Sequence, residues 1–179
     1  MRQNRNNYVL IFDLDETLID TDEANSLAYQ QAVHDVTGIQ IPLTESRITR
    51  ETLQQMLKMD KATTDEIAAY KESIFPKYLS KTVPLPALWM VRHLTDVNVI
   101  LLTLARRERA KSVLKYYNAL SYFNHMYFKE DYEGKAKFEY LRTRVISELD
   151  HVILFENDRI MIEQALAVGI PERNIYQKI

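Results

Sequence analysis

Two aspartates two positions apart, Asp13 and Asp15, directly follow an apolar segment at residues 8–12. Side chains two residues apart at the end of a strand leave it on the same side, so both carboxylates can converge on one metal ion or one reacting group. Carboxylates held close together also separate their pKa values, so that one stays ionised while the other carries a proton. A nucleophile and a general acid need these properties. Taken alone, an Asp-x-Asp pair more often caps a turn than performs chemistry.

Hydroxyl and cationic side chains follow a second apolar segment at residues 97–102. Thr103 comes next, and a predicted helix then opens with Arg106, Arg107 and Arg109. A hydroxyl beside the free amides of a helix N-terminus forms an anion site. Arginines in a first helical turn oppose the helix dipole, so their presence indicates that positive potential is needed there. For each arginine alone, a solvated surface position is an equally good explanation.

An acidic cluster, Glu156-Asn157-Asp158, follows a third apolar segment at residues 152–155. Its oxygens could complete a site for a hard cation. Asn157 or Asp158 could also be the N-cap of a helix predicted at residues 158–168, and both roles can hold together.

A lysine stands at the start of another predicted helix. Lys135 follows Gly134, close to the end of a weaker strand candidate at residues 125–128. A lysine at this place can neutralise the charge of a phosphoryl group, although most lysines are simply solvent-exposed. Lys137, two residues further on, is the competing candidate.

The elements that position these side chains alternate between strand and helix. The three apolar segments are four to six residues long, which is typical of strands buried on both faces of a parallel sheet. Helical patterns separate them, and residues 174–177 are a further weak strand. The alternation predicts an α/β fold with a doubly wound parallel sheet and right-handed crossovers. Such sheets bind ligands beyond the carboxyl ends of their strands, where the side chains above are expected.

Residues 20–84 differ from the rest because they contain no convincing strand. They show three helical patterns, of which the third starts at Thr63 with a Thr-x-x-Glu capping box to Glu66. We therefore expect a core domain at residues 1–19 plus 85–179 and a small all-helical insertion at residues 20–84.

Length and composition limit the class of protein. The 179 residues are 46% hydrophobic and the net charge is −2, which fits one domain with an insertion and argues against a broad basic surface for nucleic acid. The absence of cysteine excludes disulfides, thiolate zinc sites and cysteine nucleophiles. No apolar run is long enough to span a bilayer, and the polar start is not a secretory signal, so we expect a cytoplasmic protein without a membrane partner.

In this order the motifs resemble those of the haloacid dehalogenase-like hydrolase superfamily. That superfamily combines an Asp-x-Asp-x-Thr pattern after a strand, a threonine or serine after a second strand, a lysine, and an acidic group before a helix. The matching positions are Asp13–Thr17, Thr103, Lys135 or less favourably Lys137, and Glu156–Asp158. The helical insertion lies where the family places a small C1-type cap.

The resemblance implies a Mg²⁺-dependent phosphatase or phosphotransferase acting on a small phosphorylated metabolite. Asp13 would attack phosphorus to form an aspartyl-phosphate, and Asp15 would protonate the leaving oxygen and then activate water. Thr103 and Lys135 would hold the phosphoryl oxygens. Magnesium would bind Asp13, the main-chain carbonyl of Asp15 and a fourth-motif residue. Halide-removing members of the family lack the second aspartate, so Asp15 indicates phosphorus chemistry.

Asn157 departs from the family pattern, because an aspartate normally ligates magnesium at that position. An amide oxygen can ligate the ion but brings no charge, so the affinity should fall, unless Asp158 takes over with a local shift. Three readings therefore stay open: a phosphatase, a phosphomutase of the same family, and a weak or inactive binding protein with this fold.

Substrate choice would fall to the cap and to residues near the phosphoryl site. The candidates for substrate contact are Thr17, Arg47, Arg50 and Arg106. Each arginine alone is more often an ordinary exposed side chain. The sequence specifies neither the substrate nor the oligomeric state.

Overall fold

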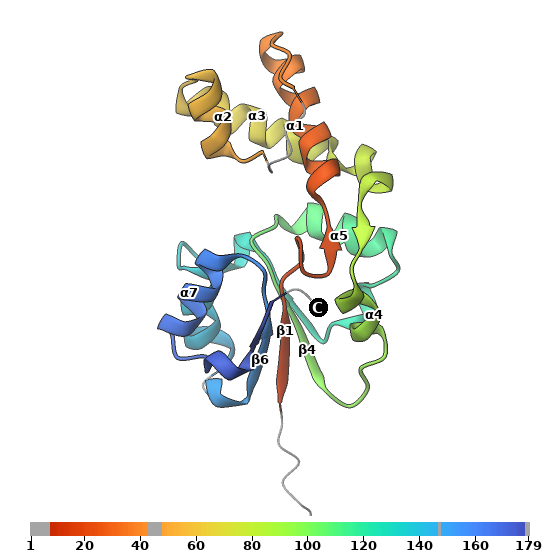
Figure 1. Cartoon of the computed structure of the whole chain (residues 1–179), viewed down its shortest axis with the longest axis vertical. Helices are drawn as coiled ribbons and strands as arrows, with labels where there is room; N and C mark the ends of the chain where they lie inside the picture. Colours follow the sequence, from red (N-terminus) through yellow and green to blue (C-terminus); the bar gives the residue numbers. More distant parts are fainter. Residues whose placement is uncertain (1–7, 43–47, 147, 178–179) are drawn as a thin grey trace, which may run out of the picture. The chain divides into compact units, whose positions relative to one another are not determined.

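The computed structural model describes residues 8–42, 48–146 and 148–177, and it divides into two compact units (Figure 1). The first, here called the α/β unit, comprises the described residues up to Asp20 and from Pro84 onward. The second, here called the helical unit, is Thr21–Val83. The sequence analysis had placed the insertion at residues 20–84.

A parallel sheet of five strands forms the centre of the α/β unit. Its strands are β1 (Val9–Phe12), β4 (Asn98–Leu102), β5 (His125–Tyr127), β6 (Val152–Phe155) and β7 (Ile175–Tyr176). Their order is β5-β4-β1-β6-β7, and every neighbouring pair is parallel. The chain builds outward from β1 in one direction and then in the other, so β1 marks the switch point where α/β sheets bind ligands. The predicted doubly wound parallel sheet is confirmed.

Helices cover both faces of this sheet. They are α4 (Pro86–Arg92), α5 (Arg107–Tyr116), α6 (Lys137–Tyr140) and α7 (Arg159–Ala167). In Figure 1, α4 and α7 lie on opposite sides of the sheet. Phe138 of α6 and Ala165 of α7 are fully buried in one core with Ile11 and Leu154 of the strands. This packing fixes the strand ends from which the predicted site residues project.

Short helical turns complete the α/β unit. A π-helical turn, η4 (Leu141–Val145), continues α6. The 3-10 turns are η2 (Leu120–Tyr122), η3 (Lys129–Tyr132), η5 (Leu149–His151) and η6 (Glu172–Asn174). A separate two-stranded sheet pairs β2 (Ile19–Asp20) with β3 (Val83–Pro84).

The helical unit consists of α1 (Asp22–Thr37), α2 (Arg50–Leu57), α3 (Lys61–Ile74) and the 3-10 helix η1 (Phe75–Lys81). Helix α1 ends at Gly38, whose φ of +74° is the left-handed conformation that glycine adopts without a Cβ clash. Helix α3 begins two residues earlier than expected. Asp60 is its N-cap and accepts the N–H of Thr63 at 2.8 Å, so the predicted start at Thr63 is wrong.

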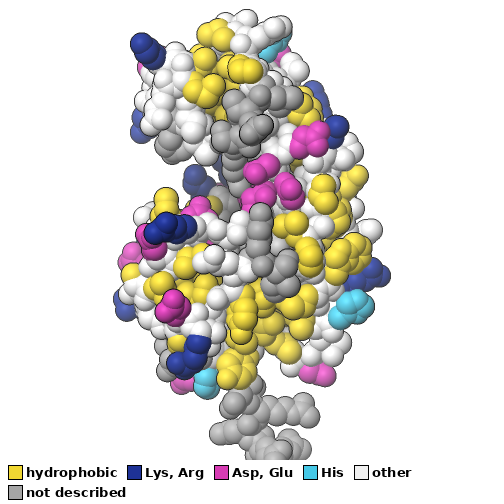
Figure 2. All heavy atoms as spheres, viewed as in Figure 1, with side chains coloured by type: hydrophobic (Ala, Val, Ile, Leu, Met, Phe, Trp, Pro, Cys, Tyr) yellow, Lys and Arg dark blue, Asp and Glu magenta, His cyan; other side chains and the backbone are white. Residues whose placement is uncertain are grey.

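The described surface of the α/β unit carries some large apolar side chains. Figure 2 shows hydrophobic side chains gathered on part of the visible face of the α/β unit. Trp89 and Tyr176 are among the exposed large apolar residues of this unit. Apolar atoms make up more than half of an ordinary protein surface. Within the described ranges, none of the helices is long and apolar enough to cross a membrane.

Candidate active site

Three buried polar side chains stand at the carboxyl ends of adjacent or nearby strands. Asp13 follows β1, Thr103 follows β4 and Glu156 follows β6. The sheet hydrogen bonds continue one residue past β1 and β4. Asp13 N donates to Phe155 O at 3.0 Å, and Thr103 N donates to Tyr127 O at 3.1 Å. Only 8% of Asp13, 1% of Thr103 and 2% of Glu156 is exposed. The backbone that carries these side chains is therefore fixed.

Lys137 joins two of these strand ends. Its Nζ donates to Asp13 Oδ1 at 2.6 Å and to Glu156 Oε2 at 2.7 Å. The lysine opens α6 and is 1% exposed. Two carboxylates and one ammonium thus form a buried charge triad at the switch point of the sheet.

Lys135, our first choice for this position, is not part of the triad. Its Nζ lies 3.5 Å from Thr143 Oγ1 in an exposed contact. Gly134 has φ +79° and helix α6 starts only at Lys137, so Lys135 still belongs to the turn before the helix. The competing candidate Lys137 is the lysine that the fold brings to Asp13.

Burial and neighbouring charge shift the proton affinity of the triad. Desolvation raises the pKa of Asp13 to about 7; Lys137 opposes this rise, whereas Glu156 and Asp15 add to it. Burial by itself would lower the pKa of Lys137, but the carboxylates of Asp13 and Glu156 outweigh it and the pKa is raised. The lysine therefore stays charged, and Asp13 holds a proton more tightly than an exposed aspartate does.

Asp15 has a cation of its own. Arg109 of α5 donates from Nη1 to Asp15 Oδ1 at 2.8 Å and from Nη2 to Oδ2 at 2.5 Å. Both side chains are nearly buried, with 11% of Asp15 and 6% of Arg109 exposed. From the sequence, Arg109 is one of three arginines at a helix opening, and nothing there pairs it with Asp15. The sequence feature that could have marked Arg109 as functional is a cation in the first turn of a helix, where the helix dipole disfavours positive charge.

The remaining hydroxyl candidates lie in the same unit. Thr103 Oγ1 accepts the N–H of Ala105 at 3.1 Å, and the Thr103 carbonyl accepts the hydroxyl of Tyr132 at 2.6 Å. Burial raises the pKa of Tyr132, so its hydroxyl stays a donor. The buried hydroxyl oxygen of Thr17 has no hydrogen-bond partner among the described residues, and its contact with a substrate stays a prediction.

The two candidates for the last metal ligand differ in what they already bind. Asp158 Oδ1 caps α7 by accepting the N–H groups of Ile160 at 2.8 Å and Met161 at 3.2 Å. Glu156 Oε1 accepts the N–H groups of Asn157 at 2.9 Å and Asp158 at 3.0 Å. The Asn157 side chain makes no hydrogen bond within the described part of the chain. Asp158 is thus engaged as a helix cap, whereas the Asn157 side chain is not, and the choice between them as metal ligand stays a prediction.

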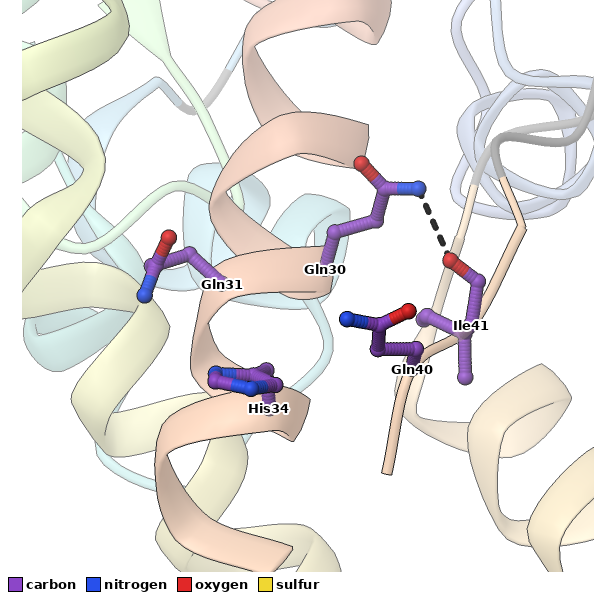
Figure 3. Close-up of a pocket in the computed structure, with 5 residues that line it drawn as sticks. All are labelled: Gln30, Gln31, His34, Gln40 and Ile41. Carbon is purple, nitrogen blue, oxygen red and sulfur yellow. Dashed lines mark hydrogen bonds between the residues drawn. The ribbon is translucent and has the colours of Figure 1, made fainter. Parts of the chain in front are cut away.

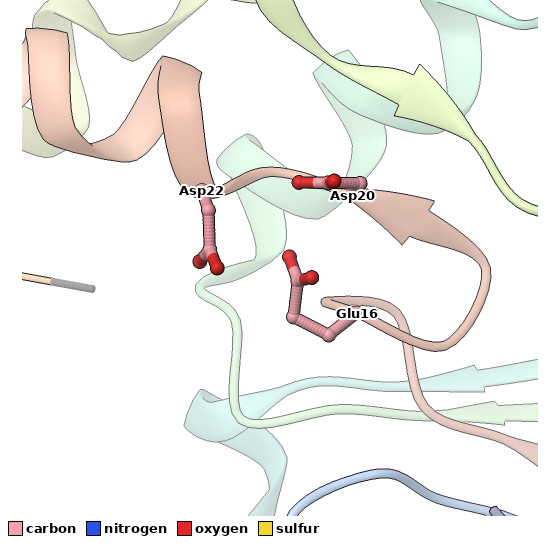
Figure 4. Close-up of side chains that lie close together, drawn as sticks. All are labelled: Glu16, Asp20 and Asp22. Atoms are coloured by element: carbon pink, nitrogen blue, oxygen red, sulfur yellow. The ribbon is translucent and has the colours of Figure 1, made fainter. Parts of the chain in front are cut away.

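These residues fit a magnesium ion in the type of their donors. The Asp13 carboxylate, the Asp15 carbonyl and the Asn157 amide are all oxygen ligands, which Mg²⁺ prefers. They bring only one carboxylate charge. A second acidic group, Glu16, Asp20 and Asp22, has oxygens within 4.8 Å of one another in a single short segment (Figure 4). These carboxylates are half-buried, and their proximity alone does not identify a ligand, so we assign no function to the group.

The predicted substrate-contact arginines do not gather at the strand ends. Arg106 is exposed just before α5. Arg50 opens α2 in the helical unit and pairs with Asp65 at 3.0 Å. Arg47 lies outside the described residues. Their contact with a substrate stays a prediction.

The helical unit contains a pocket that sequence reasoning did not find. It has a volume of ≈ 380 Å³ and is lined by Gln30, Gln31, His34, Gln40 and Ile41 (Figure 3). Gln30 Nε2 donates to Ile41 O at 2.8 Å across it. The amides lack the spacing of any motif, so no sequence signal marks this pocket.

Comparison with known proteins identifies the class. The family model of the haloacid dehalogenase-like hydrolases matches residues 10–172. The chain belongs to this family, as the motif order predicted. A search of curated proteins finds no match.

Solved structures share the fold over nearly the whole chain. A candidate phosphoglycolate phosphatase from Lactobacillus plantarum is 14% identical, with a TM-score of 0.76 and coverage of 96% of this chain and 86% of that one. A candidate phosphatase from Clostridium difficile is 20% identical, with a TM-score of 0.71 and coverage of 93% and 84%. A candidate β-phosphoglucomutase from Thermotoga maritima is 20% identical, with a TM-score of 0.65 and coverage of 95% and 84%.

Proposed function

We propose that the protein is a Mg²⁺-dependent phosphatase that hydrolyses a small phosphorylated molecule through an aspartyl-phosphate on Asp13. One observation carries the proposal: a buried aspartate at the switch point of the sheet is held by a buried lysine, with a second aspartate two residues away. Membership of a hydrolase family supports the reaction type. The candidate phosphatases among the structural relatives support phosphorus as the electrophile.

Asp13 acts as the nucleophile. Lys137 binds its Oδ1, whereas Oδ2 has no hydrogen-bond partner among the described residues, so Oδ2 is the oxygen that attacks phosphorus. Attack forms a bond from Oδ2 to phosphorus and breaks the bond from phosphorus to the leaving oxygen. Lys137 neutralises negative charge on the carboxylate and the phosphoryl oxygens, and Thr103 lies at the neighbouring strand end as a further contact.

Asp15 moves the protons. Its carboxyl gives a proton to the leaving oxygen, and the resulting carboxylate then accepts a proton from the water that hydrolyses the aspartyl-phosphate. The residues that would hold Mg²⁺ are Asp13, Asp15 through its carbonyl, and Asn157. The ion would add the positive charge that phosphoryl transfer needs.

Asn157 supports one alternative, a protein that keeps the fold and binds a phosphorylated ligand without turnover. Without the usual aspartate the metal site has one negative charge fewer, so Mg²⁺ affinity decreases. Phosphate release separates the alternatives. A phosphatase releases inorganic phosphate, a phosphomutase returns the phosphoryl group to its substrate, and a binding protein does neither.

The test is phosphate release from an aryl phosphate and a panel of metabolite phosphates, with Mg²⁺ and with EDTA. We expect Mg²⁺-dependent release that Asp13→Asn lowers by at least about 1,000-fold, because the nucleophile is lost. Asp60→Asn is the matched control, since it removes a carboxylate from the helical unit and asparagine caps helices equally well. Release that survives Asp13→Asn, or no release from folded wild-type protein, would contradict the proposal.

A further inference from the structure

Arg109 is the buried cation that the proposed reaction has not yet used. Its guanidinium meets Asp15 through two parallel hydrogen bonds, at 2.8 and 2.5 Å, across 94 residues of sequence. Bidentate pairing of this kind fixes direction as well as distance. Lysine could supply the same charge but not the planar fork.

The backbone around Asp15 is fixed without help from Arg109. Leu18 N and Ile19 N both donate to Leu14 O, at 3.0 and 3.1 Å, and Glu16 N donates to Ile19 O at 2.8 Å. Leu14 and Leu18 are fully buried on either side of Asp15. The turn therefore holds the Asp15 main chain, and only the rotation of its carboxyl group is left to be set.

Fold stability gives a poor reason for placing Arg109 here. Desolvation of two charges offsets most of their attraction, and an apolar pair often stabilises a fold as well. An arginine in the first turn of α5 also opposes the helix dipole. Because the position of Arg109 is unfavourable on both counts, it needs a reason outside stability. Its guanidinium pairs with Asp15, the proposed proton-transfer group.

We infer that Arg109 is a positioning residue that fixes the orientation of the Asp15 carboxyl group for proton transfer. The inference rests on the proposed phosphatase function. Nη1 and Nη2 of Arg109 each donate to a different oxygen of Asp15, so the fork fixes the plane in which both carboxyl oxygens lie. The O–P bond of the substrate breaks as the Asp15 proton passes to the leaving oxygen. When water then hydrolyses the aspartyl-phosphate, Asp15 accepts a proton from that water, so protons balance over one turnover.

The test compares Arg109→Met and Arg109→Lys with wild type on an aryl and an alkyl phosphate. We expect Arg109→Met to lower kcat by about 10- to 100-fold with KM changed less than about threefold, because misorientation of a proton donor costs part of its contribution. The loss should be larger for the alkyl phosphate, whose leaving oxygen depends more on protonation. Arg109→Lys should recover part of kcat.

Arg107→Met is the matched control. Arg107 lies in the same turn of α5 and pairs with Asp131, not with Asp15. Its removal takes the same charge from the same helix end, and we expect kcat within about twofold of wild type. Thermal unfolding of all variants shows whether they are folded.

A double-mutant cycle distinguishes positioning from a general structural effect. If Arg109 acts through Asp15, Arg109→Met lowers kcat by less than about threefold once Asp15 is already Asn. An equal loss in both backgrounds, an unchanged kcat in folded Arg109→Met and Arg109→Lys, or a rise in KM alone would overturn the inference while the phosphatase function stands. No phosphate release from wild type would overturn both.

Discussion

The two units bury different kinds of polar side chain. The buried polar residues of the α/β unit are Asp13, Thr103, Arg109, Lys137 and Glu156, and those of the helical unit are Thr21, Asn25, Ser26, Thr64, Lys71 and Thr82. Among the described residues, four of these five in the α/β unit are ionisable, against one of the six in the helical unit. The charged partners in the α/β unit come from distant elements, whereas Thr64 donates to carbonyls of its own helix turn, Asp60 O and Lys61 O.

This difference indicates that the α/β unit carries the larger desolvation penalty, at the residues of the proposed active site. A buried hydroxyl is satisfied locally by its own backbone, but a buried charge needs a partner brought by tertiary structure. Lys71 of the helical unit is the instructive exception. Its Nζ lies 3.2 Å from Glu72 and about 5 Å above the rings of Tyr29 and Phe75, so it combines a carboxylate from its own helix with two aromatic faces.

Replacing each buried lysine by methionine gives the largest contrast between the units. Lys137→Met leaves Asp13 and Glu156 buried without their cation, and we expect a loss of about 3–5 kcal/mol in the free energy of unfolding. Lys71→Met leaves the partly exposed Glu72 without this cation and keeps an apolar stem among aromatic rings, so it should cost less, about 1–2 kcal/mol. Urea unfolding measures both. Equal losses in the free energy of unfolding would show that the two carboxylates of the triad need Lys137 no more than the surroundings of Lys71 need that lysine.

The pH dependence of Asp13→Asn tests the strain in the triad. The pKa of Asp13 is about 7 in the folded protein against an ordinary 3.8, so the folded state binds the proton more tightly and wild type loses stability as the pH rises from about 4 to 7. Asparagine does not titrate. In EDTA, Asp13→Asn should therefore gain about 2.5 kcal/mol relative to wild type between pH 5 and pH 8. A constant difference across this range would contradict the raised pKa.

Adding a carboxylate at position 157 tests the charged site of the α/β unit by increasing its negative charge. Asn157→Asp adds a second carboxylate to the proposed Mg²⁺ ligands, and we expect the dissociation constant for Mg²⁺ to fall by about tenfold or more. Titration calorimetry and the rise of Tm with Mg²⁺ measure this without relying on turnover. Asp158→Asn is the control, because asparagine retains the cap of α7. If Asp158→Asn binds Mg²⁺ more tightly than wild type, or if Asn157→Asp does not, then Asn157 is not a Mg²⁺ ligand.

The sequence predicted the sheet and the aspartates because both depend on local pattern. Short apolar runs are typical of strands buried on both faces, and even the weak candidates at residues 125–128 and 174–177 contain β5 and β7. The spacing of Asp13 and Asp15 was sufficient to place them after β1. The fold then brings Glu156 to the adjacent strand end, as parallel strands require.

The errors concern helix starts and contacts between distant residues. Lys137 lies at the site because α6 begins there, and the two-residue offset from Lys135 is smaller than sequence patterns resolve. Asp60 and Thr63 are both good N-cap residues, and the earlier one caps α3. The pairing of Arg109 with Asp15 depends on how α5 packs against the turn after β1, which no local pattern contains.

Removal of a helix cap should have the smallest effect and should not distinguish the units. Asp60 caps α3 in the helical unit and Asp158 caps α7 in the α/β unit, each by accepting a backbone N–H at 2.8 Å. Capping energy is local, so Asp60→Ala and Asp158→Ala should each lower Tm by about 2–4 °C, and asparagine at either position should restore it. Because Asp158 is already engaged as a cap, its removal should leave Mg²⁺ affinity within about twofold of wild type. A large loss of affinity in Asp158→Ala alone would make Asp158 a metal ligand, and the contrast between the units would then extend to their helix caps.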